Sequence, residues 1–238
     1  YTKNFKNLVK NIHKKWNDNV AILSGDAMFI LAYDYLFQYH GESFRETLQT
    51  FNQTALKVCE GQQYDMNFEA QDSVAEKEYL KMIELKTAVL IAASLKIGAL
   101  MGNASDEDVQ MLYNFGLYMG MAFQLQDDFL DTFGDPEVFG KKIGGDIAAN
   151  KKTYLYIKAL EKTDANDNQK LQKLYRFDYQ GTAEEKVQNV TEIFEKTRVD
   201  EITKSKIEDY FDRAYKSLNS VNVSLEKKQN LTELADRL

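Results

Sequence analysis

The amino-acid sequence predicts an all-α protein, folded as a bundle of many helices. Pro136 is the only proline among 238 residues, and a proline inside a helix removes a backbone hydrogen bond and breaks the helix. Apolar residues recur at intervals of three and four along several long segments, which is the pattern of a helix with one buried face. Patterns typical of strands are weak throughout. A helical bundle is therefore the predicted architecture.

Capping residues mark where the predicted helices begin, because a side-chain oxygen at a helix start accepts a hydrogen bond from the first turn. These residues and their partners are Ser43 with Glu46, Ser73 with Glu76, Ser105 with Asp108, Thr182 with Glu185, and Ser224. The first pair predicts a helix over about residues 44–60, and the second pair predicts one over about residues 73–101. From the third pair, apolar residues continue at helical spacing to Leu130.

The helical pattern breaks between about Asp131 and Asn150, where glycines and the proline lie beside lysines. This composition predicts a loop with a functional role. A helix is predicted to resume at Lys151, and the polar segment Glu161–Gln169 is predicted to be a linker. The hydrophobic content of 44% is enough for a sizeable core. We therefore predict a single helical domain over residues 1–238.

Composition also excludes several classes of function. The formal net charge is −7 and no stripe of basic residues with aromatics occurs, so we expect no nucleic-acid partner. Cys59 is the only cysteine, so no disulfide can form within the chain. This fits a reducing compartment and predicts a cytoplasmic protein in which Cys59 is a small buried helix residue. The most apolar run, residues 88–94, is too short to span a bilayer, so no integral membrane protein is predicted.

Three carboxylates form the strongest chemical signal in the sequence. On a helix, Asp127, Asp128 and Asp131 lie within about one turn of each other and project from adjacent parts of one face. Like charges at this spacing raise each other's pKa unless a cation lies among them. Oxygen ligands of this kind suit Mg²⁺. The alternative is an acidic helix end in solvent, but the aromatic neighbours Phe123 and Phe129 favour a metal at the edge of an apolar site.

Other metals fit the sequence less well. No acidic loop has the spacing of an EF-hand, which disfavours calcium. His13 and His40 are the only histidines, and neither belongs to a Glu-x-x-His motif, which disfavours zinc and di-iron sites. Magnesium is therefore the predicted ion.

Basic and polar residues elsewhere have the chemistry of phosphate ligands. Lys86 and Thr87 lie together in an apolar helical segment, where they can bind a phosphate as a point charge and a hydroxyl donor. The alternative is a lysine that extends to the surface. The glycine-rich segment 140–146 contains Lys141 and Lys142, and Lys151 and Lys152 follow it. These lysines either close over a diphosphate or belong to a surface loop.

In combination, these residues resemble a known family. The run Gly120–Asp131 resembles the second aspartate-rich motif of the trans-isoprenyl diphosphate synthases, which include farnesyl and geranylgeranyl diphosphate synthases. Further segments are similar to motifs of that family in the same order, and they are Ala21–Ala27, Glu60-Gly61-Gln62 with Asp65, Lys86-Thr87-Ala88, Phe139–Ile147 and Asn150–Thr153. The resemblance runs from about Ile12 to the C-terminus.

The resemblance implies a helical bundle around a central apolar cavity, usually a homodimer, which lengthens an allylic diphosphate with isopentenyl diphosphate. Asp127 and Asp131 would hold Mg²⁺, with Asp128 as a direct or water-mediated ligand. The residues implied to bind the substrates are Lys86, Thr87, Gln124, Phe123, Lys141, Lys151 and Gln62. Of these, Thr87 and Gln124 would form hydrogen bonds near the reacting centre. Lys142 is an alternative to Lys141, and Lys152 is an alternative to Lys151.

One departure from the family pattern leaves alternatives open. The family carries a first aspartate-rich motif and an arginine pair shortly before the segment that matches His13–Asn17, and residues 1–11 contain neither. We favour the interpretation that a segment is missing upstream or near residues 11–12. A non-catalytic partner subunit of a prenyl synthase is the second hypothesis. A class I terpene cyclase, which uses the same metal chemistry without a second substrate, is the third.

Overall fold

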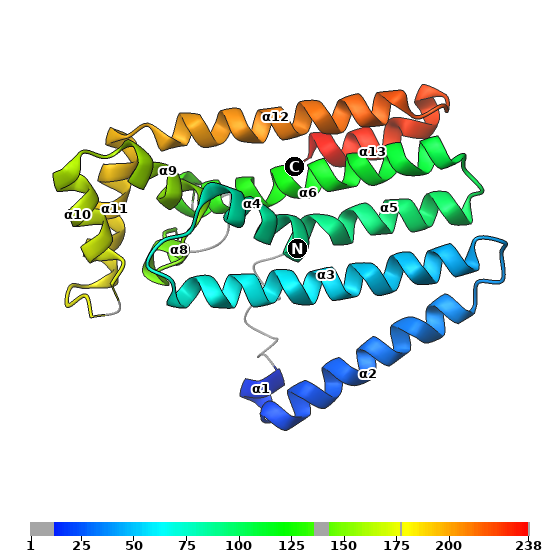
Figure 1. Ribbon diagram of the computed structural model, residues 1–238, viewed down its shortest axis with the longest axis horizontal. Helices are drawn as coiled ribbons and strands as arrows, with labels where there is room; N and C mark the ends of the chain where they lie inside the picture. The colour runs from blue at the N-terminus through cyan, green and yellow to red at the C-terminus, as the bar shows by residue number, and fades with distance from the viewer. Residues whose placement is uncertain (1–11, 136–142, 177, 238) are drawn as a thin grey trace. The chain divides into compact units, whose positions relative to one another are not determined.

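The computed structural model describes residues 12–135, 143–176 and 178–237. The described residues form helices and no strand, so the all-α prediction is confirmed. In chain order the elements are α1 (Ile12–Lys15), α2 (Asp18–Phe37), α3 (Phe44–Ala70), α4 (Glu76–Ile83), the π-helix η1 (Glu84–Ala88), α5 (Val89–Met101), α6 (Asp106–Phe133), α8 (Gly145–Ala148), α9 (Tyr154–Lys162), α10 (Ala165–Leu174), α11 (Ala183–Lys196), α12 (Val199–Ser220) and α13 (Leu225–Asp236) (Figure 1).

The chain divides into two compact units, Tyr1–Leu48 and Gln49–Leu238, with the boundary inside α3. In the first unit, the Asn17 side chain caps α2 by accepting a hydrogen bond from the Val20 backbone N–H at 2.9 Å. No residue of α2 is buried. By length and composition alone, α2 is the one helix in the described part of the chain that is apolar enough to cross a membrane, a test that core helices and N-terminal signal sequences also pass. Asp26 and Asp34 interrupt the apolar residues of α2, so the sequence contains no uninterrupted apolar run of this length.

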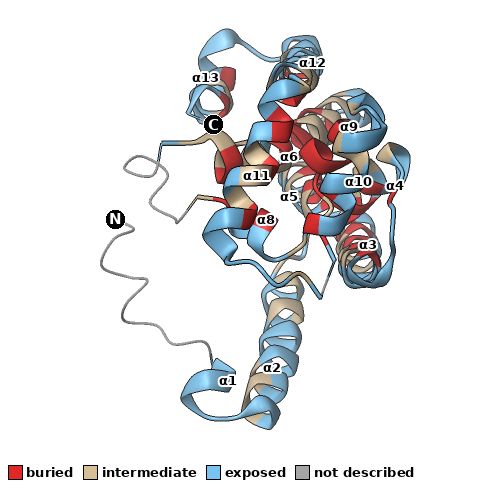
Figure 2. Ribbon diagram, turned by 90° about the vertical axis from the view of Figure 1, so that its left-hand side faces the viewer, coloured by how far each residue is buried: buried red, intermediate tan, exposed pale blue. Residues whose placement is uncertain are grey.

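In the second unit, α6 is the central helix. It packs against α5 on one side and α12 on another, and the three helices run side by side (Figure 1). Two glycines allow the close approach on the α5 side, since an added Cβ would lie 2.8 Å from the Ala92 Cα at Gly116 and 2.5 Å from the Ala88 Cα at Gly120. Buried residues concentrate in the middle of this unit and exposed residues on its outer surface (Figure 2).

The helix starts predicted from capping chemistry are mostly confirmed. Ser105 caps α6 by accepting from the Asp108 N–H at 3.2 Å, and Ser224 is the N-cap of α13. Thr182 and Glu185 form a complete capping box at α11. The Ser73–Glu76 pair is wrong, because the N-cap of α4 is Ala75, two residues later, where Glu78 accepts from the Ala75 backbone N–H at 3.0 Å.

Helix lengths differ from the predictions in several places. α3 continues to Ala70, about ten residues past its predicted end, so Gln62 lies within the helix rather than after it. The predicted loop before residue 150 contains the short helix α8, and the following helix α9 begins at Tyr154 rather than Lys151. The predicted linker 161–169 is largely helical, because α10 begins at Ala165. Cys59, predicted to be buried, is exposed on α3.

Candidate active site

Lys86 and Thr87 lie in the π-helical turn η1, where the helix widens between α4 and α5. Single π-helical turns occur frequently at functional sites. The backbone of this turn is in close contact with α3, because a Cβ added to Gly61 would lie 2.3 Å from the Lys86 nitrogen. The Lys86 Nζ donates a hydrogen bond to the Asp65 Oδ2 at 2.6 Å. A tertiary contact between glycine and backbone therefore brings this lysine and carboxylate together.

Asp128 is the most deeply buried carboxylate of the predicted cluster, with 4% of its surface exposed. The Tyr79 hydroxyl donates to its Oδ2, and the Gln124 Nε2 donates to its Oδ1 at 3.0 Å. The Thr87 hydroxyl in turn donates to the Gln124 Oε1 at 3.0 Å. Burial raises the pKa of Asp128 to about 7, although the Tyr79 hydrogen bond lowers it, while the nearby charge of Asp146 also raises it. The hydrogen bonds run continuously from Thr87 to Tyr79.

Asp131 lies one turn further along α6 and binds the segment that follows the undescribed residues. Its Oδ2 accepts a hydrogen bond from the Asp146 backbone N–H at 2.8 Å, and its carbonyl accepts from the Gly144 N–H at 2.6 Å. Burial raises the pKa of Asp131, the Asp146 hydrogen bond lowers it, and the charges of Asp146 and Asp127 raise it further. Asp131 thus anchors the start of α8 to α6.

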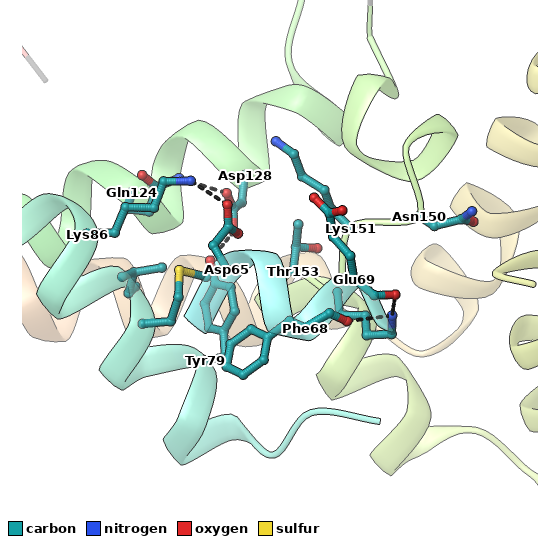
Figure 3. A pocket seen from close by; sticks show the side chains of 13 residues that line it. Asp65, Phe68, Glu69, Tyr79, Lys86, Gln124, Asp128, Asn150, Lys151 and Thr153 are labelled. Atoms are coloured by element: carbon teal, nitrogen blue, oxygen red, sulfur yellow. Dashed lines mark hydrogen bonds and ion pairs between the residues drawn. The ribbon is translucent and has the colours of Figure 1, made fainter. Parts of the chain in front are cut away.

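These elements surround a pocket of about 80 Å³ with polar and apolar walls (Figure 3). Its lining residues are Asp65, Phe68, Glu69, Tyr79, Met82, Ile83, Lys86, Gln124, Asp128, Asn150, Lys151, Lys152 and Thr153. Lys86 and Gln124 lie on one side and Lys151 on the other, with Asp65 and Asp128 between them (Figure 3). The larger central apolar cavity stays a prediction.

The structure brings several of the predicted site residues together in this pocket, namely Lys86, Gln124, Asp128 and Lys151. Thr87 joins them through its hydrogen bond to Gln124. Other predicted residues do not line the pocket: Asp127 and Asp131 lie beside it on α6, Phe123 is 41% exposed, and Gln62 is exposed on α3. Lys141 and Lys142 lie outside the described residues.

The two rival lysines of the following segment have different partners. The Lys151 Nζ contacts the Asp146 Oδ1 at 2.5 Å. Burial alone would lower the pKa of Lys151, but the hydrogen bond and charge of Asp146 outweigh burial and raise it. The Lys152 Nζ donates to the carbonyls of Phe68 at 2.9 Å and Glu69 at 3.5 Å, so it caps the C-terminal end of α3. Lys152 is therefore bound to the backbone of α3, whereas Lys151 pairs with a side chain.

The donor set fits a hard divalent cation that shares its ligands with a phosphate. In the described part of the chain, no group of three or more His, Cys, Asp or Glu side chains is placed to hold a metal ion. The three predicted carboxylates therefore do not form a complete metal cage, since Asp128 is bound to Tyr79 and Gln124 while Asp131 is bound to Asp146. Magnesium is usually held by one or two carboxylates, waters and substrate phosphates, which is what the half-exposed Asp127 with Asp131 can supply.

Three residues that shape this site were assigned no individual role from the sequence. Tyr79 is 2% exposed and hydrogen-bonds a carboxylate 49 residues away. Asp146 links Asp131 to Lys151. Asn150 has a left-handed backbone with φ of 59°. Asparagine tolerates this conformation better than most other residues with a Cβ. An asparagine directly before the lysine pair was therefore a sequence signal for a left-handed turn at this point.

The described residues form an all-helical fold with a pocket lined by lysines and carboxylates, and comparison with known proteins shows the family to which this chain belongs. Residues 9–195 match the profile of the Polyprenyl synthetase family. The chain belongs to the polyprenyl synthetase family, as its predicted resemblance to trans-isoprenyl diphosphate synthases implied.

Individual relatives support the same assignment. The chain is 40% identical over 187 residues to a short chain isoprenyl diphosphate synthase of Methanothermobacter thermautotrophicus, a match that covers 78% of this chain and 56% of the relative. It is 42% identical over 153 residues to a geranylgeranyl diphosphate synthase of Methanosarcina mazei, covering 63% of this chain and 47% of the relative. A crystal structure of a geranylgeranyl pyrophosphate synthase matches 94% of this chain and 69% of its own with a TM-score of 0.88 and 40% identity. The chain thus spans about half the length of these first two curated relatives.

Proposed function

We propose that the protein lengthens an allylic diphosphate (dimethylallyl, geranyl or farnesyl) with isopentenyl diphosphate to a longer trans-polyprenyl diphosphate. The observation that carries this proposal is the placement of Lys86 and Lys151 on opposite sides of one pocket, with Asp65 and Asp128 between them. Two lysine ammonium groups facing one pocket can bind the two phosphate groups of a diphosphate. The neighbouring carboxylates repel each other and would be stabilised by a divalent metal that arrives with it. The relatives named as isoprenyl and geranylgeranyl diphosphate synthases support the same chemistry.

We infer the following roles for the pocket residues in that reaction. Lys86 and Lys151 bind the diphosphate and stabilise its charge as the allylic carbon–oxygen bond breaks. The double bond of isopentenyl diphosphate then forms the new carbon–carbon bond, and the released diphosphate accepts the proton that is lost. Asp127 and Asp131 would hold Mg²⁺, which would supply further charge neutralisation for the leaving group. Gln124, oriented by Thr87 and Asp128, hydrogen-bonds near the reacting carbon.

Product analysis tests this function directly. The chain is incubated with geranyl diphosphate, isopentenyl diphosphate and Mg²⁺, and the products are separated by length. We expect longer linear diphosphates. We expect Lys86→Gln to raise KM for the allylic substrate by roughly 10- to 100-fold, the range for a lost charge-assisted hydrogen bond. Lys81→Gln is the matched control, because Lys81 pairs with Glu84 on the surface and does not line the pocket. A cyclic hydrocarbon formed without isopentenyl diphosphate would instead establish a terpene cyclase.

We also propose a cytoplasmic homodimer rather than an integral membrane protein. The exposed apolar side chains of α2 support a protein contact, because contiguous apolar surface on a soluble chain usually marks an interface. They include Leu23, Met28 and Ile30, each more than half exposed. Light scattering after size-exclusion chromatography should give twice the chain mass, and Leu23→Glu should shift it toward the single-chain mass. Recovery of the wild-type protein only from the membrane fraction would contradict both parts of the proposal.

A further inference from the structure

The short helix α8 ends in a backbone conformation that an asparagine adopts at a cost. The Lys151 N–H donates to the Asp146 carbonyl at 3.0 Å, and the Asn150 N–H donates to the Ile147 carbonyl at 3.1 Å. These two bonds form a Schellman motif, which requires a left-handed residue and usually uses glycine there. Asn150 occupies this position with φ of 59°. A residue with a Cβ adopts this region less readily than glycine, although asparagine does so more readily than most, so contacts that hold Asn150 there favour the conformation.

The group that holds Asn150 is a lysine from α11. Lys186 is 4% exposed, and its Nζ donates to the Asn150 Oδ1 and lies 3.5 Å from the Ala148 carbonyl. Within the described ranges Lys186 makes no ion pair, and its ammonium group lies 5.1 Å from the centre of the Tyr175 ring. Both of its oxygen partners belong to the end of α8, so the buried charge is satisfied by this segment alone.

An apolar side chain would suit the position of Lys186 better if packing were the only requirement. Val190, Ile193 and Phe194 are buried on the same face of α11 at helical spacing from Lys186. Burying an ammonium group without a counter-ion is unfavourable, and burial lowers the pKa of Lys186. The unfavourable burial indicates a specific role for the lysine, and its contacts with Asn150 and Ala148 supply one.

The neighbouring residue of α11 holds the other end of the same segment. Gly144 has φ of 80°, and a Cβ added there would lie 2.5 Å from the Val187 Cγ1. Helix α11 therefore contacts the segment at Gly144 through Val187 and at Asn150 through Lys186. Between these points, the segment binds Asp131 on α6. The next residue, Lys151, extends over the pocket, while the Asn150 amide extends to the opposite side (Figure 3).

From these contacts we infer that Lys186 is a positioning residue for diphosphate binding: it holds Asn150 in the left-handed conformation that directs Lys151 into the pocket. This inference rests on the proposed function, since it assigns Lys151 to the diphosphate. Lys186 does not touch the substrate, because its Nζ is occupied behind the segment. Its effect reaches the substrate through the backbone at Asn150.

The inference is tested first by removing the Lys186 ammonium group, and then by replacing Asn150 with glycine, which needs no side-chain contact to adopt the left-handed conformation. Lys186→Met keeps much of the side-chain volume but loses the donor, and it should weaken the binding of inorganic diphosphate with Mg²⁺ about tenfold, which corresponds to 1.4 kcal/mol. Glycine adopts the left-handed conformation without a Cβ penalty. In an Asn150→Gly background, Lys186→Met should therefore cost less than twofold. Calorimetric titration measures diphosphate binding by wild type, Lys186→Met, Asn150→Gly and the double variant. In turnover assays, Lys186→Met should raise KM for the allylic substrate and leave kcat within about twofold of wild type.

Two further variants control for folding and for glycine itself. Asn150→Ala removes the acceptor and leaves Lys186 in place, so it should reproduce the tenfold loss even where Lys186→Met folds poorly. Asn103→Gly is the matched control, because Asn103 also has a left-handed backbone, with φ of 53°, at the far end of α5. It should leave diphosphate binding unchanged.

The outcomes separate this inference from the proposed function. Diphosphate binding within twofold of wild type in Lys186→Met and Asn150→Ala would overturn the role of Lys186 while the proposed function stands. A tenfold loss that persists in the Asn150→Gly background would also overturn it, since Lys186 would then act by charge or general stability. If the wild-type chain binds no diphosphate, both the role of Lys186 and the proposed function are wrong.

Discussion

The protonation of Asp128 makes a quantitative prediction about stability. Burial raises the pKa of this carboxyl from 3.8 to about 7 in the folded protein. Between these values the folded state keeps a proton that the unfolded state has lost, so the free energy of unfolding decreases as pH rises. The slope approaches 1.36 kcal/mol per pH unit, and over about three units the loss is about 4 kcal/mol. Below pH 3.8 both states are protonated and this term vanishes.

Asp128→Asn isolates that contribution, because asparagine has nearly the shape of the protonated acid. Its oxygen can accept from Gln124, and its amide can donate to the Tyr79 hydroxyl, which acts as an acceptor after rotation. We expect the variant to match wild type near pH 4 and to exceed it by about 4 kcal/mol at pH 8. Urea unfolding at half-unit pH steps, with EDTA to remove divalent cations, measures the difference directly.

A second variant checks the direction of the effect. The Tyr79 hydrogen bond lowers the pKa of Asp128, so Tyr79→Phe should raise that pKa and extend the loss of stability to higher pH. If the free energy of unfolding of wild type and of Asp128→Asn changed in parallel between pH 4 and pH 8, the reasoning would be refuted. Asp128 would then have the same pKa in the folded and unfolded states.

Two further predictions concern packing. Gly120→Ala should lower the free energy of unfolding by about 1–3 kcal/mol in urea titrations, because the new Cβ would lie 2.5 Å from the Ala88 Cα between two helix backbones; Gly98→Ala, with nothing within 4 Å, is the control and should be neutral or stabilising. Tyr175→Phe should leave stability unchanged or raise it by about 1 kcal/mol in thermal unfolding, since the Tyr175 hydroxyl is buried and has no hydrogen-bond partner among the described residues; a loss above 1 kcal/mol would reveal a partner that this structure does not show.

Local chemistry was enough to predict most of the helices. The capping box at Thr182 and Glu185 is determined by residues three positions apart, so it can be identified without tertiary information. The end of α3 could not be predicted in this way. Gly61 suggests a helix end by composition, but it lies inside α3 because the Lys86 backbone packs against it and leaves no room for a side chain. The same glycine that appears to interrupt the helix in sequence therefore permits a contact between helices.

The candidate site shows a similar division. The helical spacing of Asp127, Asp128 and Asp131 was correctly identified, but it does not say which carboxylate faces which partner. Tyr79 binds Asp128 across 49 residues and Lys86 binds Asp65 across 21. Such pairs depend on how α3, α4, η1 and α6 pack, and a single sequence contains no signal for them. The different environments of three adjacent acids are therefore a property of the fold rather than of the motif.

These environments link the proton on Asp128 to the ligands of the pocket. Three acidic residues, Asp65, Glu69 and Asp128, line it with three lysines, Lys86, Lys151 and Lys152. While Asp128 keeps its proton, the lining carries net positive charge and favours a free diphosphate. A divalent cation favours the ionised carboxylate instead, so its arrival should release that proton. Because the pKa of Asp128 is about 7, a small change in local charge near neutral pH is enough to switch the protonation of this carboxyl, and with it the net charge of the pocket lining.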